Sequence, residues 1–265
     1  MLADGYSPLI LRKSAMHRKR KPLLPVIAFV VLSALQPGGL TAFAQGPGQR
    51  LPLPPIPLKG DTTHTLSKHF TTASAAKKAP DARGFIQRWL VLEPIKKDIV
   101  RNNIFTDNYL RTTFSADSFS SDYTTVPKIG ETVNVGNQAL TWYALDSKAF
   151  NVNLYHFTYA INKPKYGILV WLVTVIDCPE EIKNVRMAAG CNSGSMWWLN
   201  GQEALLLSGD RDMIADNGTS ARLTLKKGRN IIRGAVINGP GMANFCVRFL
   251  DEKGSPVKNL SIRYE

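Results

Sequence analysis

Apolar residues alternate with polar ones in short runs from residue 84 to the C-terminus, and turns rich in Gly, Asn and Asp separate the runs. Alternation puts every second side chain on one face of an extended chain, so each run predicts a half-buried strand. Many short strands with frequent turns are typical of an all-β sandwich. The predicted strands span residues 84–95, 132–135, 140–145, 154–161, 166–177, 185–189, 195–200, 222–225, 230–238, 243–250 and 257–262.

Two segments differ from this simple alternation. Residues 166–177, YGILVWLVTVID, are almost unbroken apolar and β-branched, which predicts a central strand buried on both faces. Residues 102–119 have apolar side chains at mixed spacings, and we expect a short helix over 106–113. Thr106 would cap this helix, and Asp107 would suit the positive end of its dipole.

The stretch 188–201, AAGCNSGSMWWLNG, is the most distinctive part of the chain. Trp197 and Trp198 lead into Asn200-Gly201, which predicts a strand that enters a tight turn. A second run, 223–232, predicts a strand, a turn at Lys227-Gly228 and another strand. Because strand side chains alternate, the two tryptophans should point to opposite faces of the sheet.

This pairing of WxNG with LxKGxN resembles the galactose-binding-like jelly roll, a β-sandwich found as an accessory module in secreted enzymes that act on polysaccharides. The resemblance implies that Trp198 faces outward and that Trp197 is buried. Longer segments, among them RWLVLEPI, VIDCPEEIKNVRMAAG and LTLKKGRNIIRGAVINGPG, resemble a region of secreted Bacteroidetes-type proteins called acetylxylan esterases. That likeness covers nearly all of residues 84–265 and implies a role in the breakdown of acetylated xylan or a related polysaccharide.

The N-terminal part of the chain is unlike the rest. A basic run at residues 16–21, an apolar run at 23–35 and the small-x-small pattern Ala42-Phe43-Ala44 predict a signal peptide over 1–44, with Met16 as an alternative start. The apolar run is too short for a stable membrane anchor, so a secreted or periplasmic protein is expected. Residues 45–83 are rich in Pro, Thr and Ala and predict a disordered linker, which leaves 84–265 as the β-sandwich domain.

Charge and cysteine usage narrow the function classes. The chain has 33 Lys and Arg against 20 Asp and Glu, and the leader holds six of the bases and one of the acids, so the mature chain carries a net charge of +8. Six more bases precede Gly84, and no nucleic-acid-binding motif accompanies them, so no nucleic-acid partner is expected. Cys178, Cys191 and Cys246 could form one disulfide, but strand-like neighbours favour three buried thiols.

A catalytic centre is not evident. Ser193 lies in Gly190-Cys-Asn-Ser-Gly194, one place late for the GxSxG elbow of an α/β-hydrolase, and the alternating βα pattern of that fold is missing. His156 is the single histidine of the predicted domain and is expected to be structural. An arrangement of Ser193, His156 and Asp210 can be written down, but no sequence feature brings the three together, so no catalytic residue is predicted.

Binding residues are easier to nominate. The candidate ligand-binding residues are Trp198, Trp142, Asn200, Asp210 and Arg211, because aromatic rings stack on sugars and polar side chains pair with hydroxyl groups. No cofactor is predicted, although Asp210, Asp212 and Asp216 of the polar loop 206–220 could hold a structural Ca²⁺. A solvated loop is the simpler interpretation, because the spacing does not match an EF-hand.

The leading hypothesis is an exported, non-catalytic module that binds a xylan-type polysaccharide and works beside a catalytic enzyme partner. The alternatives are an acetylxylan esterase with an unrecognised active site and a structural domain that docks onto another protein.

Overall fold

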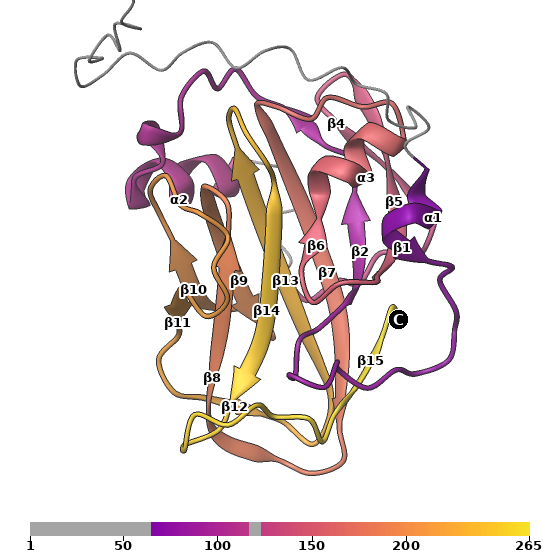
Figure 1. Ribbon diagram of the computed structural model, residues 1–265, viewed down its shortest axis with the longest axis vertical. Coiled ribbons are helices and arrows are strands. Elements are labelled where there is room, and N and C mark those ends of the chain that lie inside the picture. The colour runs from indigo at the N-terminus through magenta and orange to yellow at the C-terminus, as the bar shows by residue number, and fades with distance from the viewer. Residues whose placement is uncertain (1–64, 117–122) are drawn as a thin grey trace, which may run out of the picture. The chain divides into compact units, whose positions relative to one another are not determined.

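The computed structural model describes residues 65–116 and 123–265, and these residues form two antiparallel sheets with three short α-helices (Figure 1). The larger sheet has ten strands and the smaller has five. In spatial order, the larger sheet runs β1 (Phe70–Thr71), β5 (Gln138–Ser147), β2 (Arg88–Leu92), β7 (Ile168–Cys178), β13 (Gly228–Asn238), β9 (Gly194–Leu199) and β10 (Gln202–Leu207), with β3 (Ile95–Lys96) and β15 (Ser261–Arg263) paired to β7 and β4 (Thr132–Val135) paired to β5. The smaller sheet runs β11 (Gly218–Thr219), β8 (Ile182–Cys191), β14 (Asn244–Leu250) and β6 (Val152–Asn153), with β12 (Leu223–Leu225) paired to β8.

One hydrophobic core lies between the two sheets. Trp89 of β2, Trp197 of β9 and Phe245 of β14 meet there, with ring centroids 5.2–5.7 Å apart, so their contacts join the larger sheet to the smaller one. Gly234 of β13 makes room for this cluster, because a Cβ at that position would overlap the Trp197 ring. The all-β sandwich that the sequence predicts is confirmed.

A second core covers the opposite face of the larger sheet. Trp171 and Trp198 point to this face, and α2 (Asp107–Ser115) covers it with Leu110 and Phe114. Ten of the eleven residues of β7 are buried, which confirms the prediction of a central strand covered on both sides. The helix predicted near Thr106 is also confirmed, and the Thr106 hydroxyl caps it by accepting from the Tyr109 amide at 3.3 Å.

The strand predicted over 154–161 is wrong, because these residues form the helix α3 (Leu154–Ala160). The carboxamide oxygen of Asn153 accepts from the His156 amide at 2.9 Å and caps the helix. Leu154, Phe157 and Thr158 are fully buried, which is the i, i+3, i+4 spacing of one helix face. Alternation and helical spacing coincide in this short segment, and the asparagine cap was the signal that separated them.

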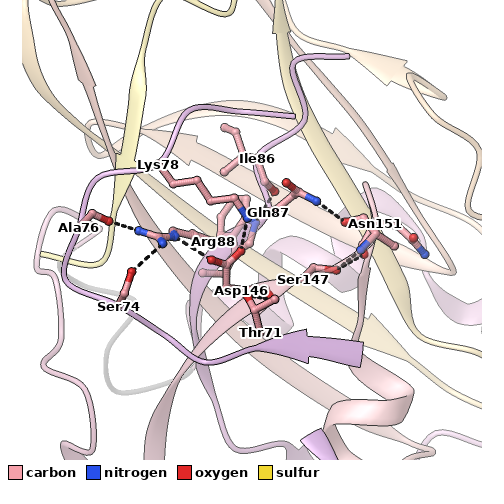
Figure 2. A network of polar contacts seen from close by, with 12 residues as sticks. Thr71, Ser74, Ala76, Lys78, Ile86, Gln87, Arg88, Asp146, Ser147 and Asn151 are labelled. Atoms are coloured by element: carbon pink, nitrogen blue, oxygen red, sulfur yellow. Dashed lines mark hydrogen bonds and ion pairs between the residues drawn. The ribbon is translucent and has the colours of Figure 1, made fainter. Parts of the chain in front are cut away.

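The described residues begin at 65, within the segment 45–83 that the sequence predicts as a linker. The helix α1 (Leu66–His69) leads into β1, which pairs with β5. Figure 2 shows a buried ion pair that fastens the following segment: Arg88 Nε lies 3.0 Å from Asp146, and Lys78 reaches the same carboxylate at 2.6 Å. Arg88 also donates to the carbonyl of Ala76.

The predicted signal peptide and the proline-rich part of the predicted linker lie outside the described residues. Within the described ranges, none of the helices has the length and apolar character needed to cross a bilayer.

Candidate functional site

Both tryptophans of the 188–201 stretch are buried, so the expected exposure of Trp198 is wrong. Trp197 and Trp198 do point to opposite faces, as predicted, and their exposed fractions are 0% and 4%. The outward face is not solvent, because the second core covers it. Trp198 stacks on Tyr123 at 4.4 Å and on Trp171 at 5.7 Å between ring centroids. Neither indole face is therefore open to a ligand.

The asparagines of the WxNG and LxKGxN patterns bind each other. Asn200 Nδ2 donates to Asn230 Oδ1 at 2.9 Å, and Asn200 Oδ1 accepts from the Ile231 amide at 2.9 Å. Asn230 is fully buried and also bonds the backbone of Lys226 and Gly228. The pair ties the β9–β10 turn to the β12–β13 turn, so the most distinctive sequence pattern serves the fold, and both ends of the Asn200 amide are engaged within the protein.

The remaining predicted binding residues also have structural partners. Trp142 of β5 is 3% exposed and belongs to the second core. Asp210 accepts from Asn102 Nδ2 at 2.9 Å, and Arg211 donates to the Ser208 carbonyl at 2.9 Å.

The three acids proposed for Ca²⁺ do not form a shared cluster. Asp216 pairs with Arg248 of β14, with Nε and Oδ1 2.9 Å apart, whereas Asp210 bonds Asn102. Across residues 65–116 and 123–265, no group of three His, Cys, Asp or Glu side chains is arranged to hold a metal ion.

Ser193, His156 and Asp210 each contact a different neighbour. Ser193 is 1% exposed and donates from Oγ to Asn238 Oδ1 at 2.7 Å. The His156 ring, on α3, stacks on the His69 ring with centroids 3.8 Å apart. Asp210 bonds Asn102. Each of these contacts stabilises a turn, a helix or a loop, and none of them joins two of the three residues.

The three cysteines are free and buried, as the sequence favours. Burial raises the pKa of the Cys178 thiol to about 11, that of Cys191 to about 12 and that of Cys246 to about 11. All three thiols therefore stay protonated near neutral pH and are poor nucleophiles.

Three tyrosines gather on the surface at α3 and the loop that leads to β7, and we call Tyr155, Tyr159 and Tyr166 the tyrosine cluster. Tyr155 and Tyr159 are four residues apart, so α3 places them on one side of the helix. Their rings are nearly parallel, at 12°, with centroids 6.4 Å apart. The Tyr166 ring lies 5.8 Å from that of Tyr155. Tyr159 and Tyr166 are 38% and 43% exposed, so the cluster presents aromatic surface to solvent.

Lys165 sits over the tyrosine cluster. Its ammonium lies 4.5, 5.2 and 5.6 Å from the ring centroids of Tyr159, Tyr155 and Tyr166. A hydrogen bond with Tyr155 raises the pKa of Lys165, and hydrogen bonds from Tyr166 and then Lys165 lower the pKa of Tyr155. The cluster thus combines exposed aromatic faces with hydroxyl groups and one fixed positive charge.

A polar cleft of about 410 Å³ is the alternative site, next to the β9–β10 turn. Its lining includes Asn200, Glu203 and Arg222, and none of its lining residues is aromatic. Glu203 is engaged with Arg111 of α2 through both carboxylate oxygens, at 2.7 Å for one of them. The cleft offers polar partners but no aromatic face on which a sugar ring could stack.

Sequence reasoning missed the tyrosine cluster because it assigned residues 154–161 to a strand. On a strand, Tyr155 and Tyr159 share a face with Phe157, which is fully buried. The helical spacing separates Phe157 from the two tyrosines and leaves them at the surface. Asn153 at the N-cap position was the available signal.

No model of a known protein family matches the chain, and no curated protein shows significant similarity to it, so the resemblance to acetylxylan esterases has no support from these comparisons. Among solved structures, the PA14 domain of the MpAFP antifreeze protein is similar at 12% identity over 72% of this chain and 95% of that one, with a TM-score of 0.37. A PA14 sugar-binding domain from an RTX adhesin is similar at 12% identity over 66% and 96%, with a TM-score of 0.34.

A β-glucosidase from Kluyveromyces marxianus, solved with glucose, is similar at 18% identity over 46% of this chain and 16% of that one, with a TM-score of 0.33. An anti-sigma factor domain-containing protein is matched over 39% of its own length, with a TM-score of 0.36. All of these TM-scores are below 0.5, so the assignment of a β-sandwich rests on the sheets of this chain itself.

Proposed function

We propose that this protein is a carbohydrate-binding β-sandwich module and that the tyrosine cluster is its sugar-binding surface. The observation that carries the proposal is the exposure of Tyr159 and Tyr166 beside the parallel ring of Tyr155. A pyranose ring has an apolar face of C–H groups that gains contact with an aromatic face, while its hydroxyl groups keep polar partners at the ring edges. Tyrosine supplies both kinds of surface.

The rigidity of the support favours this role. The inward face of α3 is held by fully buried Leu154 and Phe157, and the helix start is capped by Asn153. The loop after α3 returns directly into β7, the central strand. Aromatic side chains on a fixed helix face lose little conformational freedom on binding, which preserves more of the contact energy.

We further propose that the module is exported, acts without catalysis and retains a xylan-type plant polysaccharide near a degradative enzyme partner. The leader pattern supports export to the periplasm or beyond the cell, and the sequence resemblance supports the substrate class. The structural contacts of Ser193 and Asp210, and the three protonated thiols, favour binding over hydrolysis.

The test is retention on insoluble polysaccharides, measured by pull-down and affinity electrophoresis on xylan, galactan and cellulose. The wild-type protein should be retained on at least one of them, and the Tyr159→Ala/Tyr166→Ala variant should lose about tenfold or more in affinity with its thermal midpoint unchanged. Ile129→Ala is the control, since it removes an apolar side chain that is even more exposed, at 53%, and lies outside the cluster.

Two results would overturn the proposal. Absence of wild-type retention on every polysaccharide would remove the carbohydrate function. Retention that survives the double tyrosine substitution would keep the function and move the site, with the cleft beside Asn200 as the next candidate.

Acetate release from acetylated xylan is measured in the same assay. Release that Ser193→Ala abolishes would make the protein an esterase.

A further inference from the structure

We propose that the tyrosine cluster selects glycans that carry carboxylate groups, as in polysaccharides built from or decorated with uronic acids. The inference rests on the proposed function and adds the substrate class. Its basis is Lys165, which lies over the rings, together with Lys96, which bonds the Tyr166 carbonyl, and Lys163, two residues before Lys165. We call these three residues the lysine collar.

Lys165 places a positive charge over the three rings. Its ammonium lies within 5.6 Å of all three ring centroids, and among the described residues no carboxylate pairs with it. The charge is therefore held at the sugar-stacking surface and is left without an anion. A sugar carboxylate placed over the rings would meet this charge directly and form a charge-assisted hydrogen bond.

Lys96 extends the positive surface along the same loop. Lys96 Nζ donates to the Tyr166 carbonyl at 3.0 Å, and the Lys97 amide donates to the Gly167 carbonyl at 2.8 Å. These contacts hold the β3 strand and the residue after it against the loop that carries Tyr166 and Lys165. The two segments are about 70 residues apart in the chain, so the fold assembles this part of the collar.

Lys163 completes the collar and borders a hollow. It lines a space of about 290 Å³ together with Lys96, Pro94 and Pro164, directly beside Lys165 in the chain. Lys163 pairs with Glu93 at 3.0 Å, and Glu93 is 6% exposed. Glu93 therefore compensates Lys163, and within the described residues no ion pair compensates Lys96 or Lys165.

The combination of the tyrosine cluster and the lysine collar favours an acidic glycan over other anionic ligands. Single-stranded nucleic acid also uses aromatic stacking with a positive groove. That mode needs a track of cations that follows the phosphates over several nucleotides, whereas the collar surrounds one small cluster of rings. A neutral glycan would use the rings and leave the collar unused. The proposal therefore commits to a carboxylated sugar and makes the other two ligands outcomes of its test.

The test uses polygalacturonate and its methyl ester, which share one backbone and differ in the carboxylate charge. Affinities are measured by titration calorimetry on the protein at low and moderate salt. We expect wild-type protein to bind polygalacturonate about tenfold more tightly than the ester at low salt, and the ratio should shrink as salt is added.

Lys165→Met should bring that ratio close to one by weakening polygalacturonate binding alone. Lys253→Met is the matched control, because Lys253 is exposed in the turn after β14. β14 begins at its pairing with β6, next to the start of α3, and its length places the turn about 20 Å from that point. The control should leave the ratio unchanged.

Each contrary result has a distinct meaning. Equal affinity for the two polymers, or a ratio that Lys165→Met does not change, overturns the inference and leaves the proposed function standing. Binding to neither polymer nor to any neutral polysaccharide removes the proposed function as well. An oligothymidylate that binds as tightly as polygalacturonate overturns the selection of carboxylated sugars in favour of a single-stranded nucleic-acid site.

Discussion

The tryptophan pair of β9 and the tyrosine cluster of α3 are both rich in aromatic rings, but the fold uses them in opposite ways. Trp197 and Trp198 are sealed into two cores on opposite faces of one sheet. Tyr159 and Tyr166 keep about two fifths of their surface in water. Buried rings stabilise the sandwich through contact and exclusion of water, whereas exposed rings contribute little to stability and remain available to a ligand. Coverage by other segments, and not ring type, makes the difference.

The largest effect on stability should come from substitution of a buried tryptophan. Trp197→Ala should lower the free energy of unfolding by about 3–5 kcal/mol, because the indole contacts Trp89 and Phe245 and the cavity cannot fully collapse. Urea unfolding followed by circular dichroism measures this. Tyr159→Ala, the paired variant, should change stability by less than about 1 kcal/mol. Equal losses in the two variants would contradict the contrast.

Burial should also decide how strongly a charged group affects stability. Asp146→Ala should cost about 3 kcal/mol, because it leaves Arg88 buried without its partner carboxylate. The double variant Arg88→Met/Asp146→Leu should be less destabilised than Asp146→Ala, since it leaves no buried unpaired charge and the Lys78 that also loses its partner is 34% exposed. A double variant that unfolds as readily as Asp146→Ala would show that the network in Figure 2 stabilises through more than charge pairing.

Much of the sandwich was accessible from the sequence, because the apolar runs of β7, β9 and β13 and the turn residues between strands are local patterns. The coverage of Trp198 was not accessible. It depends on Tyr123 and α2 packing across the sheet, a contact between segments about 75 residues apart that no local pattern encodes. Asn200 was predicted to bind a ligand, but its side chain bonds Asn230 and serves the fold.

The candidate site was lost through one error of periodicity. The residues 154–161 alternate well enough for a strand, and a seven-residue helix offers too few turns for its period to dominate. The buried positions Leu154, Phe157 and Thr158 fit the helix, but burial is visible only in the folded protein. Lys165 and the lysine collar could not be placed at all, because β3 and the loop before β7 meet only through the tertiary fold.

Substitution of the exposed Tyr159 should have a smaller effect, and only on affinity. Tyr159→Ala should weaken binding of the retained polysaccharide by about fivefold, which corresponds to about 1 kcal/mol of lost stacking. Titration calorimetry measures the affinity, and Tyr159→Phe should keep most of it because the ring remains. An Ala variant that binds like the wild type would place the ligand elsewhere.

The smallest effect concerns a partly exposed ion pair. Arg263 first, and then Lys77, lower the pKa of Asp177. The resulting stabilisation is present above the ordinary carboxylate pKa of about 3.9 and is lost as the pH falls through the lowered value of the folded protein. Lys77 is 60% exposed, so solvent screening should keep the contribution below about 1 kcal/mol.

The measurement is urea unfolding of the wild type and Asp177→Asn at pH 7 and pH 2. The stability difference between the two proteins should be present at pH 7 and should shrink at pH 2. A difference that stays constant, or grows in acid, would contradict the assigned cause.

Tyrosine footprinting locates the bound glycan on the intact protein. Tetranitromethane should nitrate Tyr159 and Tyr166 in the free protein, and peptide mass spectrometry reports the extent at each site. A saturating polysaccharide should protect these two tyrosines and leave modification elsewhere on the described surface unchanged. Nitration that continues at both sites while the glycan is bound would contradict the assignment of the tyrosine cluster as the binding surface.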